Sequence, residues 1–317
     1  MDFGEVQISD EQKQFCDLWS DECILLYKSL PESTQADATL FFAKYARTRL
    51  AGFNLFRMYY APAWSIIYWL MQLDPDSRKL SPQDRQDAKI AHFMAMFLHA
   101  LDDHLNDHQI AVTHLTLLLR SQSWVMMNTA MDCLAAEVES GPQLVSDLID
   151  DYYASIGNSN EAASLDSYCD LFRQQMATWQ IVPAMLTRRL SEDEEFSAAI
   201  QRAYGSFGIA WRLLDDVQDI KADMINGITS CIYVCLPNDM RQYWKQGRLE
   251  EKKSESEDRA EIVCSYIMQN NIIEHIKARI CRELISAAAI TDDCSLPGLA
   301  NEFRSLLRPL QNGQEDG

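Results

Sequence analysis

The chain has 317 residues, of which 47 are acidic and 28 are basic, so its formal net charge is −19. A protein this acidic is not a general nucleic-acid binder, because neutralising phosphates requires clustered lysines and arginines. Eleven glycines and nine prolines are few for a hairpin-rich sheet protein and favour long helices, and 47% hydrophobic residues are enough for a large core.

Helical periodicity dominates the chain, and no segment shows sustained alternation of polar and apolar residues. Ser9 with Gln12 forms a capping-box pattern, and Ser81 followed by Pro82 is typical of a helix start. The uncharged stretch 58–73 is shorter than the roughly 20 apolar residues of a membrane span, so it predicts a buried helix. Helices are expected over residues 10–30, 31–56, 81–108, 111–138, 142–156, 164–190, 192–225, 237–246, 256–288 with a break near 270, and 296–311.

These elements predict a single all-α domain, a helical bundle over residues 1–311, followed by a disordered tail at 312–317. The first ten residues are polar and acidic and do not resemble a signal peptide. The nine cysteines are dispersed and odd in number, which suits reduced thiols. We therefore expect a cytoplasmic protein without a transmembrane segment and without nucleic-acid partners.

Two acidic clusters lie near the C-terminal ends of long apolar helices. Asp is a weak helix former, and negative charge at a helix C-terminus opposes the helix dipole by roughly 0.3–1 kcal/mol per charge. Solvated helix ends are the ordinary explanation, but carboxylates beside apolar surface need cations or polar partners, which favours a functional one. The clusters comprise Asp102, Asp103, Asn106 and Asp107 in the first, and Asp215, Asp216, Asp219 and Asp223 in the second.

The spacing within each cluster places oxygen ligands on one helix face. Asp103 and Asp107 are four residues apart, and Asp215, Asp219 and Asp223 form a ladder with one residue per turn. Ligand sets made only of oxygen suit Mg²⁺, or Mn²⁺, more than Zn²⁺. Mg²⁺ usually keeps several waters and is held by a few carboxylates together with substrate phosphates. Two such arrays across a cavity predict a magnesium-dependent diphosphate site.

Small residues accompany the second cluster. Gly205 and Gly208 lie inside the same predicted helix, where glycine costs about 1 kcal/mol relative to alanine. Gly208, Arg212, Asp215 and Asp219 share one stripe of that helix. Two explanations fit these glycines equally well. They allow close packing of helices, or they leave room for a ligand below the metal site.

The second cluster resembles the second aspartate-rich motif of the trans-isoprenyl diphosphate synthases and class I terpene synthases. That motif has the pattern G-x-x-F-Q-x-x-D-D-x-x-D, followed by D and G. Here the motif runs from Gly208 to Asp223 and Gly227, with Trp211 and Arg212 where the pattern has F-Q.

The first cluster resembles the family's first motif, D-D-x-x-D. Asn106 stands in its last place, and Asp107 can supply the missing carboxylate one residue further on. The two motifs are separated by about 113 residues, from Asp102 to Asp215, which is also similar to the family. Two such motifs at this separation, on apolar helices of an all-α chain, are more specific than either alone.

The resemblance implies the isoprenoid synthase fold, an all-α bundle with a central active-site cavity. It also implies that Mg²⁺ ions bridge the clusters and a prenyl diphosphate, which ionises to an allylic cation. The residues that the resemblance places on the diphosphate are Arg212, Lys221, Arg173, Lys44 and Arg47. An aromatic cavity would stabilise the cation, although core packing is the competing explanation for each ring. Its expected members are Phe97, Trp211, Tyr204, Phe207, Gly208 and Trp179.

The chain departs from the elongating members of the family where they bind isopentenyl diphosphate. Two arginines follow their first motif, whereas here the next arginine is Arg120. The early G-G-K-R-x-R motif is also missing, with Lys44, Arg47 and Arg49 as the nearest substitutes. These departures favour a class I terpene synthase or cyclase that acts on a linear prenyl diphosphate.

Three alternatives stay open. A trans-prenyltransferase would join the allylic cation to isopentenyl diphosphate or another acceptor. A non-catalytic partner subunit is less favoured, because it has no need to hold the like charges of the second cluster together. A transition-metal site built on His104 and His108 lacks the paired E-x-x-H segments of di-iron bundles. A homodimer is one assembly that the resemblance allows.

Overall fold

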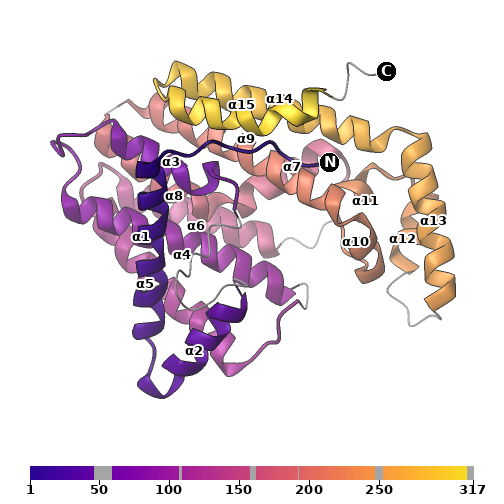
Figure 1. Ribbon diagram of the computed structural model, residues 1–317, viewed down its shortest axis with the longest axis horizontal. Helices are drawn as coiled ribbons and strands as arrows, with labels where there is room; N and C mark the ends of the chain where they lie inside the picture. The colour runs from indigo at the N-terminus through magenta and orange to yellow at the C-terminus, as the bar shows by residue number, and fades with distance from the viewer. Residues whose placement is uncertain (46–58, 107–108, 158–161, 192, 247–252, 313–317) are drawn as a thin grey trace.

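Helices account for all regular secondary structure in the residues that the computed structural model describes, which are 1–45, 59–106, 109–157, 162–191, 193–246 and 253–312. The all-α prediction is therefore confirmed (Figure 1). The first eight helices are α1 (Asp10–Lys28), α2 (Glu32–Tyr45), α3 (Pro62–Gln72), α4 (Pro82–Asn106), α5 (His114–Ala136), α6 (Gly141–Gly157), α7 (Leu165–Gln175) and α8 (Ala177–Leu190).

The C-terminal half has seven further helices. They are α9 (Glu194–Gln218), α10 (Ile220–Asn226), α11 (Cys231–Cys235), α12 (Asn238–Gln246), α13 (Lys253–Gln269), α14 (Ile272–Asp293) and α15 (Pro297–Asn312). Asn271 separates α13 from α14 in a left-handed conformation, next to the expected break at residue 270. The last five residues of the expected disordered tail, 313–317, lie outside the described residues.

Two expected helices are each divided in two. The segment expected at 164–190 breaks at Met176, and the segment expected at 192–225 breaks at Asp219, which ends α9. Asp219 adds a negative charge where the helix dipole is already negative, which weakens the helix there. The helix α10 that follows ends at Gly227, whose φ of 65° is left-handed and favours glycine. No glycine or proline stands at Met176, so the sequence carries no local signal for that break.

The helices α1 and α4 begin at the capping side chains that the sequence predicts. The Ser9 hydroxyl accepts from the backbone N–H of Gln12 at 3.2 Å, and the Gln12 side chain accepts from the backbone N–H of Ser9 at 2.9 Å. At the start of α4, Ser81 and Asp84 make the same reciprocal pair at 3.1 and 2.7 Å. Both predicted caps are confirmed, and each satisfies backbone donors that the first helical turn leaves open.

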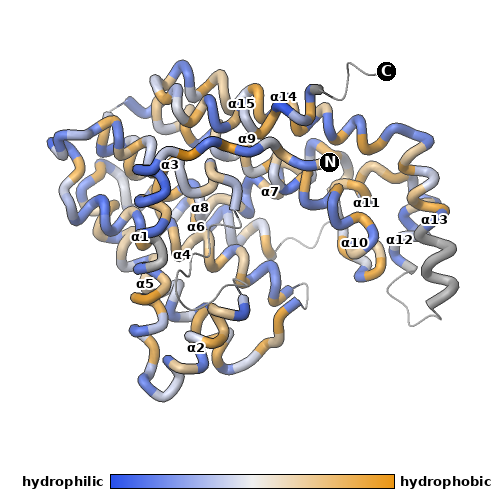
Figure 2. Tube along the Cα trace, viewed as in Figure 1, coloured by the Kyte–Doolittle hydropathy of each residue, from blue (hydrophilic) through white to orange (hydrophobic). Residues whose placement is uncertain are grey.

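The two helices that end in acidic clusters occupy the interior. α9 packs along α14 and against α8, while α4 packs along α5 and also against α8. α15 lies beside α14, and the N-terminal segment runs along it, with the N–H of Gly4 donating to the carbonyl of Leu306 at 3.0 Å (Figure 1). Hydrophilic and hydrophobic residues alternate along outer helices such as α14 and α15, as expected for helices with one buried face (Figure 2).

A buried carboxylate ties three helices together. Glu302 on α15 accepts from the Gln12 amide at 2.7 Å, from the Trp69 indole at 2.7 Å and from the Ser65 hydroxyl. These donors compensate for the burial that raises the pKa of Glu302. No described helix is long and apolar enough to cross a membrane.

Candidate functional site

The first acidic cluster lies in the last turn of α4, where its two leading carboxylates have different surroundings. Asp102 accepts a two-pronged ion pair from Arg120 on α5, with Nε–Oδ1 at 2.6 Å and Nη2–Oδ2 at 2.9 Å. The Tyr152 hydroxyl on α6 donates to the same carboxylate at 3.3 Å. The side chain of Asp103 is 41% exposed and lines a cavity. Asp102 therefore joins three helices, while Asp103 remains available to a ligand.

The second cluster divides in the same way at the end of α9. The side chain of Asp216 is 1% exposed, and its Oδ2 accepts from the Tyr168 hydroxyl at 2.8 Å and from the backbone N–H of Cys231 at 2.7 Å. Its Oδ1 lies 3.0 Å from Nε of Arg212. Asp215 is 49% exposed at the side chain and lines the same cavity as Asp103.

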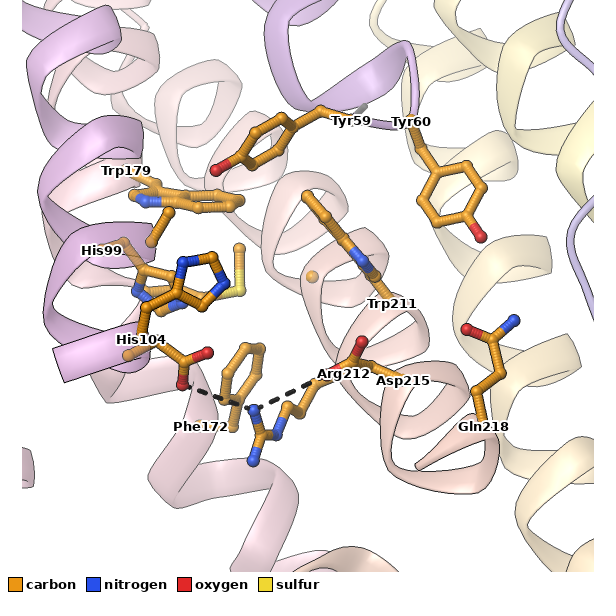
Figure 3. Close-up of a pocket in the computed structure, with 14 residues that line it drawn as sticks. Tyr59, Tyr60, His99, His104, Phe172, Trp179, Trp211, Arg212, Asp215 and Gln218 are labelled. Carbon is orange, nitrogen blue, oxygen red and sulfur yellow. Dashed lines mark ion pairs between the residues drawn. The ribbon is translucent and has the colours of Figure 1, made fainter. Parts of the chain in front are cut away.

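Arg212 lies between the two clusters. Besides Asp216, it has its Nη1 at 3.8 Å from Oδ1 of Asp103 and at 4.0 Å from Oδ2 of Asp215, so one guanidinium faces carboxylates of α4 and α9 (Figure 3). Its Nε also donates to the Tyr168 hydroxyl at 3.1 Å, and its head lies over the ring of Phe172 at 5.8 Å. Arg212 is thereby fixed on several sides.

The cavity beneath this charged rim has a volume of about 350 Å³, which is in the range of small-molecule sites. Charged and polar groups lie on one side, and aromatic rings form most of the remainder (Figure 3). The lining residues are Tyr59, Tyr60, His99, Ala100, Asp103, His104, Phe172, Met176, Trp179, Gly208, Trp211, Arg212, Asp215 and Gln218.

Aromatic rings in the wall contact each other, edge to face where Trp211 meets Tyr59 and Tyr60 and tilted where it meets Trp179. Trp211 lies 5.2 Å from Tyr59 and 5.7 Å from Tyr60 between ring centroids, and 5.7 Å from Trp179. Trp179 in turn lies 4.9 Å from the ring of His99, whose pKa is lowered mainly by burial. The lowered pKa favours the neutral form of the His99 imidazole in this part of the wall.

The structure places the expected cavity residues in two groups. Trp211, Trp179 and Gly208 line the cavity. A Cβ atom on Gly208 would lie 1.8 Å from Sδ of Met176, so the missing side chain makes room for that thioether. The remaining three aromatic residues are fully buried in the core and are not part of the lining; they are Phe97, Tyr204 and Phe207.

The reason for the second group is packing. Phe97 is fully buried and packs against Phe42 at 5.4 Å and Phe93 at 6.4 Å between ring centroids. The hydroxyl of Tyr204 donates to the carbonyl of Ala63 at 2.7 Å, which fixes its ring in the core. Core packing, the competing explanation for these rings, accounts for their positions.

The expected diphosphate-binding residues are also divided. Arg212 alone among the described ones lines the cavity. Arg173 makes an ion pair with Asp170 at 2.6 Å, and Lys221 and Lys44 are exposed outside the lining. Arg47 lies outside the described residues.

The rest of the expected metal ligands are peripheral or buried. Asn106 is exposed at the last residue of α4, and Asp219 is exposed at the end of α9. Asp223 is buried in α10. Asp107 lies outside the described residues. Among the described residues, no three candidate ligands converge on one point.

These surroundings decide how well a magnesium ion fits. Asp102 and Asp216 have both oxygens engaged by protein donors, whereas Asp103 and Asp215 line the cavity from two helices. Mg²⁺ is usually held by one or two carboxylates, several waters and substrate phosphates. The fit is therefore good for a cation shared between Asp103, Asp215 and a phosphate ligand, and poor for one held by Asp102 or Asp216.

Proton affinity is raised in the second cluster. Burial is the main cause for both Asp215, whose pKa rises to about 6, and Asp223, whose pKa rises to about 7. Nearby carboxylates add to the effect, and Arg212 opposes it. In the folded chain without metal, both groups hold protons at a pH at which an unfolded aspartate has lost them.

We expect this shift to appear in the stability of Asp223→Asn measured in EDTA. Because the pKa of Asp223 is higher in the folded state, its ionisation penalises folding as pH rises from about 4 to about 7. Wild-type protein should therefore lose stability relative to Asp223→Asn over this interval, with no further change above it. Urea unfolding of both proteins at pH 5, 6, 7 and 8 measures the difference. Parallel curves would contradict the assignment.

Several cavity residues were not predicted. Tyr59, Phe172 and Met176 come from segments that the aspartate-rich motifs do not mark, and the tertiary fold brings them to the cavity. Arg120 is the next arginine after the first motif, but nothing in its spacing indicates that it reaches Asp102. His104 also lines the cavity, and its pairing with the hydroxyl of Tyr45 at 2.7 Å joins α4 to α2.

Comparison with solved structures places this chain in the isoprenoid synthase fold. A geranylgeranyl pyrophosphate synthase from Lactobacillus brevis is 14% identical, with a TM-score of 0.69 over 94% of this chain and 99% of that one. A decaprenyl diphosphate synthase from Rhodobacter capsulatus is 13% identical, with a TM-score of 0.63 over 95% and 99%. A farnesyl diphosphate synthase from T. brucei is 12% identical, with a TM-score of 0.61 over 94% and 98%.

The resemblance inferred from the two aspartate-rich motifs is thus confirmed at the level of the fold. No protein-family model matches the chain, and no curated protein sequence matches it either.

Proposed function

We propose that this protein is a prenyltransferase, which ionises an allylic prenyl diphosphate and transfers the prenyl group to an acceptor. One observation carries the proposal: Asp103 and Asp215, from two different helices, line one aromatic cavity with Arg212 between them. The fold agrees, because the similar solved structures named above are prenyl diphosphate synthases. Transfer therefore replaces cyclisation, which the sequence favoured, as the leading function.

The rim residues would bind and orient the diphosphate. Arg212 donates hydrogen bonds to its oxygens, because its guanidinium lines the cavity and is held in place by Tyr168 and Asp216. Mg²⁺, or Mn²⁺, bound with Asp103 and Asp215 would act as a Lewis acid that neutralises the leaving group. The carboxylates and the guanidinium together would thus position the bond that breaks next to the aromatic wall.

The wall would receive the prenyl chain. Trp179, Trp211 and Tyr59 present ring surfaces to the cavity, and such surfaces attract a cation by about 0.5–2 kcal/mol each. The Phe172 ring lies 5.8 Å from the head of Arg212 and would adjoin the bound diphosphate. An apolar wall also excludes water, which protects the cation from hydrolysis.

Cyclisation remains the second candidate, and a specific observation favours it. Among the described residues, Arg212 is the one Lys or Arg that lines the cavity, while Lys44 and Arg173 lie elsewhere. Elongation brings a second diphosphate, that of isopentenyl diphosphate, and this needs further cations. A cyclase requires a single diphosphate site. A homodimer and a location in the cytoplasm, both expected from the sequence, remain predictions.

A product assay separates these functions. The purified protein is incubated with Mg²⁺ and geranyl, farnesyl or geranylgeranyl diphosphate, with and without isopentenyl diphosphate. We expect a longer prenyl diphosphate when isopentenyl diphosphate is present. A hydrocarbon or alcohol from the allylic diphosphate alone would instead identify a cyclase. No turnover in either set, from protein that binds inorganic diphosphate, would favour the partner-subunit alternative. Asp215→Asn serves as the control for metal-dependent product.

A further inference from the structure

The guanidinium of Arg212 occupies a position that a shared metal ion would also favour. It is held by the carboxylate of Asp216 at 3.0 Å and by the Tyr168 hydroxyl at 3.1 Å. From there, its Nη1 faces Asp103 at 3.8 Å and Asp215 at 4.0 Å (Figure 3). These two distances are too long for strong hydrogen bonds but close enough for direct electrostatic attraction. The guanidinium therefore bridges α4 and α9 electrostatically.

A second arginine, Arg120, pairs with a carboxylate of the first cluster in a similar way. Arg120 forms the two-pronged pair with Asp102, a geometry in which guanidinium and carboxylate match. Of the described carboxylates in the two clusters, Asp102 and Asp216 each therefore have an arginine as partner. The charge that remains for a cation and a diphosphate to balance is smaller than the number of aspartates indicates.

We propose that Arg212 is a built-in cation, which stands in for a second divalent ion beside the one that Asp103 and Asp215 would share, and binds the diphosphate directly. The inference deepens the proposed function, on which it rests for the class of ligand. Removing this positive charge should strengthen the pull of both carboxylates on a divalent ion and leave space for it. It should also remove the donors that hold a diphosphate when no metal is present.

The test counts bound metal ions without requiring turnover. Mn²⁺ bound per chain is measured from the electron paramagnetic resonance signal of free Mn²⁺, in the presence of inorganic diphosphate, for wild type and Arg212→Gln. We expect Arg212→Gln to bind one Mn²⁺ more per chain. In EDTA, isothermal titration with inorganic diphosphate should give an affinity at least tenfold weaker for Arg212→Gln than for wild type.

Two controls accompany the variant. Arg212→Lys keeps the charge and should bind as many Mn²⁺ ions as wild type. Arg202→Gln removes an exposed arginine of the same helix, one paired with Glu195, and should change neither measurement.

Arg212→Gln leaves Asp216 buried without its cation, so folding is checked by circular dichroism. The double variant Arg212→Gln with Asp216→Asn removes both charges and should show the same two changes. If either change is absent in folded Arg212→Gln or in the double variant, the proposal is overturned. The result is separable from the proposed function, because a protein that makes no prenyl product can still show both changes.

Discussion

Asp103→Asn is expected to lower kcat for the allylic diphosphate by about 10²–10³-fold, or ~2.7–4 kcal/mol of transition-state stabilisation. Asp103 is the one carboxylate of the first cluster, among the described residues, that lines the cavity. Asparagine keeps the shape of the side chain but removes the charge that attracts the cation facing the leaving group. The measurement is steady-state turnover at saturating Mg²⁺.

The neighbouring Asp102→Asn is the matched control. Its carboxylate is held by Arg120 and Tyr152, so its loss should reduce kcat by less than tenfold. The cost should appear as lower stability, because Arg120 loses its partner. An equal loss of turnover in both variants would show that Asp102 is also a ligand, as the sequence first indicated. Unchanged turnover in Asp103→Asn would remove Asp103 from the site.

Asp216→Ala is expected to destabilise the fold by about 3–5 kcal/mol, the usual cost of removing one partner of a buried ion pair. Three donors lose their acceptor together: the guanidinium of Arg212, the hydroxyl of Tyr168 and the backbone N–H of Cys231. An unsatisfied buried donor carries its full desolvation cost. Urea unfolding of wild type and Asp216→Ala, followed by circular dichroism, gives the difference in the free energy of unfolding.

Asp219→Ala provides the comparison within the same motif. Asp219 is exposed at the end of α9, where its charge opposes the helix dipole, so its removal should change stability by no more than about 0.5 kcal/mol. Equal destabilisation by the two substitutions would show that the buried contacts of Asp216 are not what stabilises this end of the helix.

The sequence predicted the positions of the helices better than their breaks. Ser9 and Ser81 correctly predicted the starts of α1 and α4, because a capping box depends on residues three positions apart in the sequence. The break at Met176 was missed, because no glycine, proline or capping residue stands there. It depends on how α7 and α8 pack against α9, and such contacts are not visible in local periodicity.

The sequence pattern groups the carboxylates of the candidate site but does not indicate which side chains pair with them. Helical spacing correctly grouped Asp215 with Arg212, because both belong to one turn-by-turn stripe. It could not show that Asp102 faces Arg120, since that pair depends on how α5 lies against α4. For Phe97, an aromatic residue near a motif has the same pattern whether it faces a cavity or the core, and only the three-dimensional packing decides.

The contact between Gly208 and Met176 affects the size of the cavity but not its charge. Met176 is the residue at which α7 gives way to α8, and its flexible thioether fills the space that a side chain on α9 would need. Met176 and Gly208 thus limit the space in the cavity, while its charge comes from Asp103, Asp215 and Arg212 at the rim. Substitutions can therefore resize the chamber without altering the charges at its entrance.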